Sequence, residues 1–152
     1  MIRHMAGIAE IVEDVDAAVR YYRDVLGLAV EHEAGSPYAT IKLPGILHFG
    51  LWDRRAAAES VFGDPHAADR IPLGFSPEFE VDSVAETAAS ISAHGGQVDQ
   101  PPKVEPWGQG STRLFSLSGG LVGFAETPWA RQLAHDVAPT QQPRPETSVD
   151  GF

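Results

Sequence analysis

Two segments of the chain carry apolar residues at three- and four-residue spacing, which is the pattern of an amphipathic helix. They are residues 14–28 and 82–96. In the first segment, Asp14 or Asp16 can cap the opening turn, and in the second, Ser83 stands three residues before a glutamate in a capping box. The pattern therefore predicts two helices, each with its start signal in the sequence.

Shorter runs rich in β-branched and aromatic residues, bounded by glycine and proline, predict strands. These runs are residues 6–12, 28–35, 38–43, 46–52, 72–81, 97–102, 111–117 and 121–126. Strands and helices thus follow one another twice in the order strand, helix and three strands. We predict an α+β protein made of two βαβββ units.

This order divides the chain into four parts. They are a first unit at residues 1–53, a linker with one helical turn at 54–72, a second unit at 73–127, and a C-terminal extension at 128–152 with a short helix and a flexible tail. With 152 residues, 43% of them apolar and 21% charged, the composition is that of an ordinary globular protein.

Charge and cysteine content exclude several kinds of partner. The formal net charge is −10, and the basic residues are scattered, so we expect no nucleic-acid partner. No apolar run approaches the roughly 20 residues that span a bilayer, so we expect no membrane partner. The absence of cysteine excludes disulfides and thiolate ligands. We expect a cytoplasmic protein.

A glycine interrupts the final predicted strand, "LVGFAE", at Gly123. Glycine weakens a strand interior and often marks a bend or the close approach of another group. Two interpretations of Gly123 stay open: it replaces a side chain that would reach into a binding site, or it only allows the strand to bend.

Three stretches resemble the vicinal oxygen chelate superfamily, which includes glyoxalases, extradiol dioxygenases and bleomycin-resistance proteins. They are "EDVDAAVRYYRDVLGL", "PEFEVDSVAETAASISAHGG" and "PPKVEPWGQGSTRLFSLSGGLVGFAE". In that family each βαβββ unit curls its sheet into half a barrel, and the two halves enclose a cavity. The resemblance implies the same curled half-barrel sheets around a cavity here.

Enzymes of this superfamily hold a divalent metal with side chains from the first and last strands of each unit. Carried onto this chain, those positions fall on Gly7, His48, Ser76 and Gly123. Glycine and serine are not useful ligands for a divalent metal, and a zinc site usually needs three protein ligands. We therefore expect no metal and no other cofactor. A divalent metal held by displaced residues is the alternative.

We expect the cavity to bind a small molecule. The candidate ligand-binding residues are His48, Trp52, Trp107, Phe115 and Tyr38. Aromatic rings stack on planar ligands, and a histidine can donate a hydrogen bond or exchange a proton near neutral pH. The resemblance implies a metal-independent protein that sequesters an antibiotic or another planar or cationic metabolite.

An enzyme is the alternative: a lyase, isomerase or dioxygenase that uses a divalent metal, or His48 as its acid or base. The sequence leaves catalysis undecided and favours binding without turnover. We also expect a homodimer, because the open edges of the sheets need cover.

Overall fold

One mixed sheet of eight strands organises the molecule. The computed structural model describes residues 1–129, so most of the predicted extension at 128–152 lies outside the described residues. The strands are β1 (Ile2–Val12), β2 (Ala29–Glu31), β3 (Tyr38–Lys42), β4 (His48–Asp53), β5 (Gly74–Val81), β6 (Gln100–Val104), β7 (Gly110–Phe115) and β8 (Leu121–Glu126). Each predicted run overlaps one of them, and β1 begins four residues earlier than predicted.

Both predicted helices are present. Helix α1 (Val15–Arg20) begins at Asp14, whose side chain accepts a hydrogen bond from the Ala17 amide, and it continues into a π-helical turn (Tyr21–Val25). Helix α3 (Val84–Ala93) begins at Ser83, whose hydroxyl accepts from the amide of the predicted glutamate. Asp14, rather than Asp16, is therefore the cap of the first helix.

The segment predicted to be a linker with one helical turn contains more structure than expected. It forms α2 (Arg54–Phe62) and a 3-10 helix (Pro65–Arg70). The Asp53 side chain caps α2 by accepting from the Ala56 amide at 2.9 Å. The helix packs through small residues, because its inner face is made largely of alanine and is fully buried.

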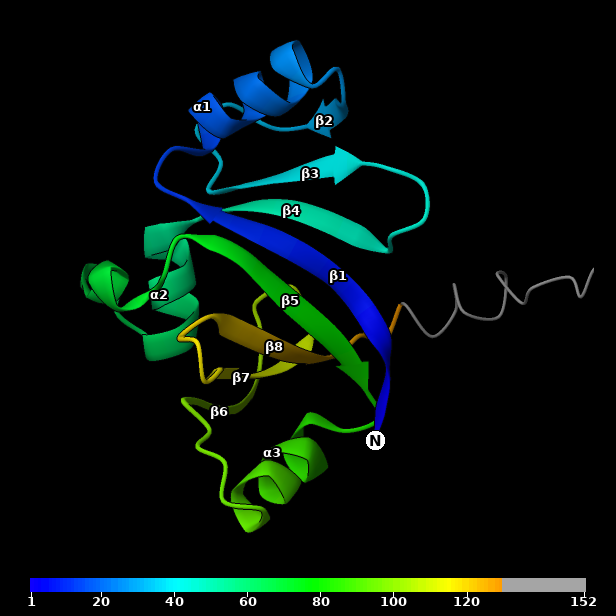
Figure 1. Ribbon diagram of the computed structural model, residues 1–152, viewed down its shortest axis with the longest axis vertical. Coiled ribbons are helices and arrows are strands. Elements are labelled where there is room, and N and C mark those ends of the chain that lie inside the picture. The colour runs from blue at the N-terminus through cyan, green and yellow to red at the C-terminus, as the bar shows by residue number, and fades with distance from the viewer. Residues whose placement is uncertain (130–152) are drawn as a thin grey trace, which may run out of the picture.

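The two units are related by the pairing of their strands. In the first unit β1 pairs with β4 in parallel, and in the second β5 pairs with β8 in parallel. An antiparallel pairing of β1 with β5 joins the units, giving the order β2-β3-β4-β1-β5-β8-β7-β6. Helices α1 and α3 consequently lie at opposite ends of the molecule (Figure 1).

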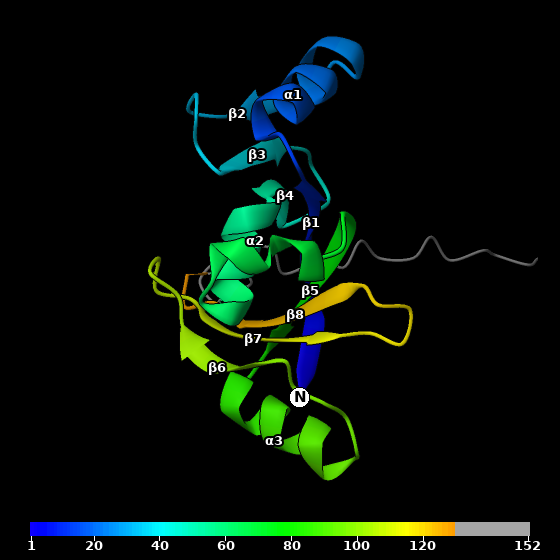
Figure 2. The same ribbon diagram turned by 90° about the vertical axis from the view of Figure 1, so that its left-hand side faces the viewer.

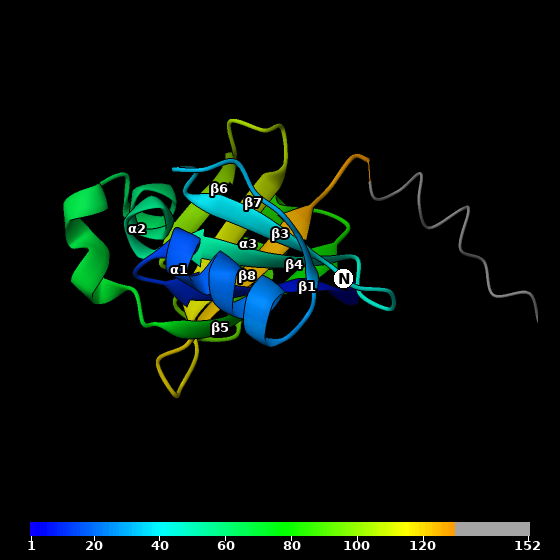
Figure 3. The ribbon, with the colours of Figure 1, turned by 90° about the horizontal axis from the view of Figure 1, so that it is seen from above.

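The two faces of the sheet have different covers. On the outer face, α1 crosses β3 and β4, and α3 packs on β6, β7 and β8 (Figure 3). Each of these helices closes its own apolar cluster. On the inner face, α2 lies in front of the sheet between the two halves and closes a third cluster (Figure 2). None of the helices within residues 1–129 is long and apolar enough to span a bilayer.

Candidate functional site

A cavity of about 710 Å³ opens on the inner face of the sheet. This volume lies within the range typical of small-molecule sites. The central strands form its floor and α2 borders one end. The segment between β6 and β7, the residues just before β3 and β4, and the residues after β8 complete the lining. Its lining residues are Ala6, Ala9, Pro37, Tyr38, Leu47, His48, Trp52, Ala56, Glu59, Ser60, Ser76, Pro77, Glu78, Lys103, Glu105, Pro106, Trp107, Gln109, Arg113, Gly123, Thr127 and Trp129.

The floor contains a row of five residues that are paired directly across the strands. His48 on β4 pairs with Gly7 on β1, and Gly7 pairs with Glu78 on β5. Glu78 pairs with Gly123 on β8, and Gly123 pairs with Arg113 on β7. Residues directly opposite one another share a face of the sheet. Side chains therefore alternate with glycines along this row.

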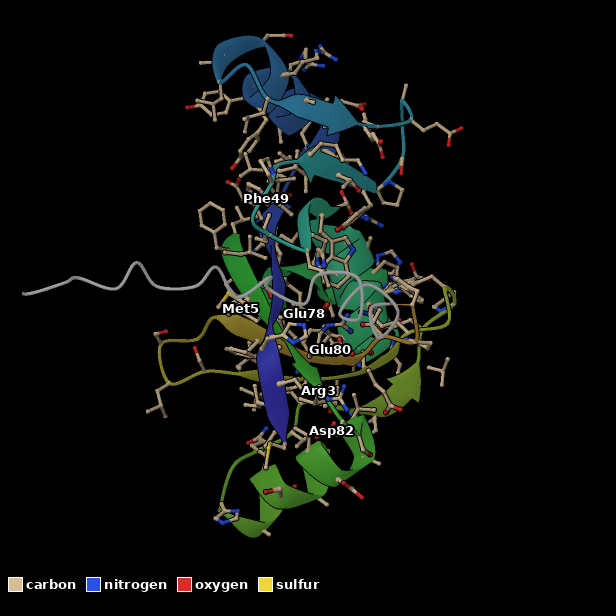
Figure 4. The ribbon with its side chains drawn as sticks, turned by 90° about the vertical axis from the view of Figure 1, so that its right-hand side faces the viewer. Arg3, Met5, Phe49, Glu78, Glu80 and Asp82 are labelled. Atoms are coloured by element: carbon tan, nitrogen blue, oxygen red, sulfur yellow. The ribbon has the colours of Figure 1, made fainter. Side chains whose placement is uncertain are left out.

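This register corrects the predicted site. In the first unit, Gly7 on the first strand pairs with His48 on the last strand. In the second unit, Glu78 pairs with Gly123 in the same way. Glu78, and not Ser76, therefore occupies the first-strand position of the second unit. Ser76 lies two residues earlier on the same face and donates its hydroxyl to the Leu121 carbonyl at 2.9 Å. In Figure 4, Glu78 and Glu80 follow one another along β5, while Met5 and Phe49 lie on the other side of the sheet.

The two glycines of the row are glycine for different reasons. A Cβ on Gly7 would overlap the carbonyl oxygen of His48 and come within 2.8 Å of the His48 ring nitrogen Nδ1. A Cβ on Gly123 would meet only the Glu78 side chain, at 3.5 Å, which is ordinary van der Waals contact. The backbone therefore requires glycine at position 7 but not at position 123, where the Glu78 carboxylate lies in the space above the glycine.

The residues present do not fit the divalent metal of the superfamily's enzymes. Only His48 and Glu78 of the four positions carry a metal-binding side chain. The Glu78 carboxylate lies over Gly123, away from the Gly7 position that separates it from His48. Residues 1–129 contain no group of three His, Asp or Glu side chains placed to hold an ion.

Four of the five predicted ligand-binding residues line the cavity: His48, Trp52, Trp107 and Tyr38. The structure does not bring Phe115 to them. Its ring stacks on Phe62 of α2, with the centroids 6.2 Å apart, and packs against the apolar cluster beneath that helix. Phe115 therefore packs beneath α2 and not against a ligand, although it lies on the same face of β7 as the cavity-lining Arg113.

Tyr38 keeps its proton in this environment. Its hydroxyl lies over Gly50, where a side chain would overlap it. Burial raises the pKa of Tyr38 to about 12, and the negative charge of Glu78 contributes to the rise. The phenol is therefore neutral at physiological pH and can donate a hydrogen bond into the cavity.

Sequence reasoning missed the residues that hold Glu78 in place. Gln109 donates its amide Nε2 to Glu78 Oε1 at 3.3 Å and to Thr127 Oγ1 at 2.8 Å. Its carbonyl oxygen accepts from the Trp107 indole at 3.0 Å. This side-chain amide thus fixes a carboxylate and an aromatic ring of the cavity relative to each other. Its one sequence signal was its place two residues after Trp107, in a stretch that carries the family resemblance.

A second polar cluster lies at the α2 end of the cavity. The Glu105 carboxylate, which is 3% exposed, accepts from Arg113 Nη1 at 2.8 Å, Ser111 Oγ at 2.7 Å and Ser60 Oγ at 2.8 Å. Burial alone would raise the pKa of Glu105, but these hydrogen bonds and the charge of Arg113 lower it overall. The carboxylate is therefore ionised and forms a buried ion pair.

Arg113 also connects the two halves of the molecule. Its guanidinium carbon lies 5.2 Å from the centre of the Trp52 ring, a cation–π contact. Trp52 is on β4 and Arg113 is on β7, and three strands separate these two in the sheet. The contact joins the first unit to the second across the cavity.

These features define a class of protein: a doubled βαβββ chain with a ligand cavity on the inner face of its sheet. A family model described as the Glyoxalase/Bleomycin resistance protein/Dioxygenase superfamily matches residues 4–124. The chain belongs to this superfamily, as the sequence resemblance predicts.

Solved structures show the same fold. A superfamily member from Vibrio splendidus is 14% identical, with a TM-score of 0.57, over 84% of this chain and 100% of its own. A methylmalonyl-CoA epimerase from Mycobacterium tuberculosis is 17% identical, with a TM-score of 0.60, over 86% and 93%. The Streptomyces coelicolor methylmalonyl-CoA epimerase, in complex with 2-nitronate-propionyl-CoA, is 18% identical, with a TM-score of 0.57, over 84% and 99%. A search of curated protein sequences finds no match to the chain.

Proposed function

We propose that this chain is a metal-independent binding protein for a planar, cationic small molecule, an antibiotic or another metabolite. The observation that carries the proposal is the row on the cavity floor. Two of its four superfamily metal positions are glycine, and the carboxylate at a third lies over one of those glycines. A carboxylate that no metal neutralises attracts a cation.

The aromatic lining supports the planar part of the proposal. Trp52, Trp107 and Tyr38 contribute rings to the same cavity as Glu78. Tryptophan and tyrosine faces attract cations, most strongly where water is excluded. A ligand with a positively charged ring system would therefore gain from stacking and from the carboxylate together.

We also propose that the sheet curls around this ligand as two half-barrels. Adjacent strands lie about 4.8 Å apart, so a flat sheet would separate β4 and β7 by about 19 Å. The 5.2 Å contact between Trp52 and Arg113 supports a curled sheet. Curling would enclose a planar ligand between the two units.

Titration with 9-aminoacridine, a planar cation, tests the proposal. Three tryptophans line the cavity, so binding should quench the protein's fluorescence. We expect Glu78→Gln to weaken binding at least tenfold, because a charged hydrogen bond contributes about 1.5–3 kcal/mol. Glu86→Gln, at an exposed position on α3, is the control. Unchanged binding by the Glu78 variant would refute the proposed role of this carboxylate.

Metal binding is tested separately. We expect calorimetric titration with Zn²⁺ or Mn²⁺ to give no stoichiometric binding, and a chelator to leave the melting temperature unchanged. A bound equivalent of metal that is lost in His48→Ala would overturn the proposal, because His48 is one of the two metal-capable side chains in the row.

One observation favours a second candidate function, proton transfer without a metal. His48 and Glu78 flank Gly7 on the same face of the sheet, so an acid and a base could stand on two sides of one carbon atom. Methylmalonyl-CoA is a reasonable first substrate, since two of the similar structures are its epimerases. Deuterium exchange into it that disappears in His48→Ala would establish this alternative over simple binding.

The homodimer stays a prediction. Analytical ultracentrifugation of the full chain tests it, and a sedimentation coefficient of a monomer at all concentrations would contradict it.

A further inference from the structure

We propose that the cavity has a second subsite for an acidic group of the ligand, formed by Lys103 and Arg113 at the α2 end. The ligand would then be amphoteric, with a cationic ring near Glu78 and a carboxylate or similar anion near the two basic side chains. This inference rests on the proposed function, which supplies the cationic end. It adds to the ligand a second charged group, an anion, which the resemblance to the superfamily does not imply.

The charges at this end do not balance. Lys103 and Arg113 both line the cavity, and Glu105 is their shared buried carboxylate partner. Two positive charges against one negative charge leave an excess of one. Glu59 lines the same end but is exposed on α2, where water screens its charge.

Arg113 has donors left for a ligand. Its hydrogen bonds all leave from Nη1, to Ser60, Gln100, Glu105 and Ser111. Within residues 1–129, Glu80 Oε2 is the one fully buried polar side-chain atom that lacks a partner. The Nε and Nη2 groups of Arg113 are therefore not sealed in the interior, and the surface that Arg113 lines is the cavity.

Lys103 also has a donor to spare. Its ammonium group donates to the Ser60 backbone carbonyl and lies 3.4 Å from Glu105 Oε2. An ammonium group has three N–H donors, so a third can reach an anion in the cavity. Arginine and lysine side by side form charge-assisted hydrogen bonds to carboxylate and phosphate groups.

The two charged ends are directed apart. Glu78 and Arg113 flank Gly123 in the floor row, which places their Cα atoms about 10 Å apart by strand spacing. The Glu78 carboxylate is bonded to Gln109, whereas the Arg113 guanidinium reaches Ser60 and Trp52. A ligand between them therefore meets a negative end and a positive end.

A matched set of three acridines tests the subsite. 9-Aminoacridine carries the cation alone, acridine-4-carboxylate the anion alone, and 9-aminoacridine-4-carboxylate both. By calorimetry, we expect the amphoteric compound to bind the full-length protein about tenfold more tightly than 9-aminoacridine. Equal or weaker binding of the amphoteric compound would overturn the subsite.

Variants identify the residues. Lys103→Met should remove most of the tenfold preference for the amphoteric compound over 9-aminoacridine, whereas Lys42→Met, at an exposed lysine on β3, should keep the preference. Arg113→Met would remove the closer of the two cationic partners of the buried Glu105 and destabilise the protein, so the paired variant Arg113→Met with Glu105→Leu tests that residue. A preference that survives in both Lys103→Met and the paired variant would refute the assignment.

The outcomes separate the two proposals. If 9-aminoacridine binds without any preference for the amphoteric compound, the proposed function stands and the subsite fails. If acridine-4-carboxylate is the only one of the three compounds that binds, and Lys103→Met abolishes this binding, the basic subsite stands and the proposal of a cationic ligand is wrong. If none of the three binds, both proposals fail.

Discussion

Gly7 and Gly123 show how far single residues could be interpreted from the sequence. Counting from the family motif placed Gly7, His48 and Gly123 correctly in one row of the sheet. It placed the fourth position on Ser76 instead of Glu78, which is on the correct face of the sheet but two residues too early along β5. The β1–β5 pairing contains two register shifts near its start, and no local sequence pattern predicts them.

The contrast between the two glycines leads to a prediction about stability. Gly7→Ala forces a Cβ against the His48 carbonyl, a backbone atom that cannot move aside cheaply, so we expect a loss of about 2–3 kcal/mol. Gly123→Ala meets a side chain at ordinary contact distance and reduces the freedom of the unfolded chain. It should be neutral or stabilising by up to about 1 kcal/mol. Urea unfolding of both variants measures this, and equal losses would contradict the distinction.

At the scale of elements, the two helices with a clear apolar periodicity could be predicted and α2 could not. Helix α1 and helix α3 have apolar residues at helical spacing, and Gly27 and Gly95 follow them with positive φ. The buried face of α2 is mostly alanine, which weakens the periodic signal. Its caps, Asp53 and a glycine with positive φ at Gly63, were present in the sequence and went unused.

Helix α2 should tolerate no enlargement of its inner face. Ala58 is fully buried, so Ala58→Leu should destabilise the protein by about 1–3 kcal/mol through overpacking. Arg55→Leu, one turn away at an exposed position, should change the stability by less than about 0.5 kcal/mol. Thermal and urea unfolding compare the two. Equal tolerance at both positions would mean that this segment is the loosely attached linker of the sequence prediction.

Glu105 joins α2 to β7, and its titration makes this junction dependent on pH. The pKa of Glu105 is lowered in the folded protein, so its ionised carboxylate stabilises the folded state. This contribution to the free energy of unfolding is fully present above the ordinary glutamate pKa of about 4.3. The contribution is lost as the pH falls through the lower, folded-state value. Glu105→Gln should cost about 3 kcal/mol at pH 7, because it leaves the charge of the buried Arg113 without an ionised partner.

The difference in unfolding free energy between the wild type and Glu105→Gln, measured from pH 7 to pH 3, isolates this group. We expect a constant difference above about pH 5 and a smaller one below about pH 4.3. A difference that does not change with pH would show that the ion pair with Arg113 does not depend on the ionised carboxylate.

At the scale of the whole molecule, the doubled order of strands and helices was the strongest sequence signal. It predicted the two-unit architecture because each unit's elements follow from local patterns. The closing of the cavity could not be predicted in the same way. It depends on contacts between distant segments, such as Trp52 with Arg113 and Ser60 with Glu105, which no local pattern specifies.

These long-range contacts should make the two units unfold together. The central pairing of β1 with β5 runs through both, and α2 of the first half packs against Leu121 of the second. Trp52 reports on the first unit and Trp107 on the second. In each of two single-tryptophan variants, one retaining Trp52 and one retaining Trp107, we expect the fluorescence transition in urea to have the same midpoint as the circular dichroism transition of that variant.

Circular dichroism on the same samples provides the control, since it follows the whole sheet of each variant. A tryptophan midpoint that departs from the circular dichroism midpoint of the same variant would show that the units are independent domains joined at one strand pair. In that case the cavity between them would open before either unit unfolds. Ligand affinity would then fall at urea concentrations where circular dichroism still reports a folded protein.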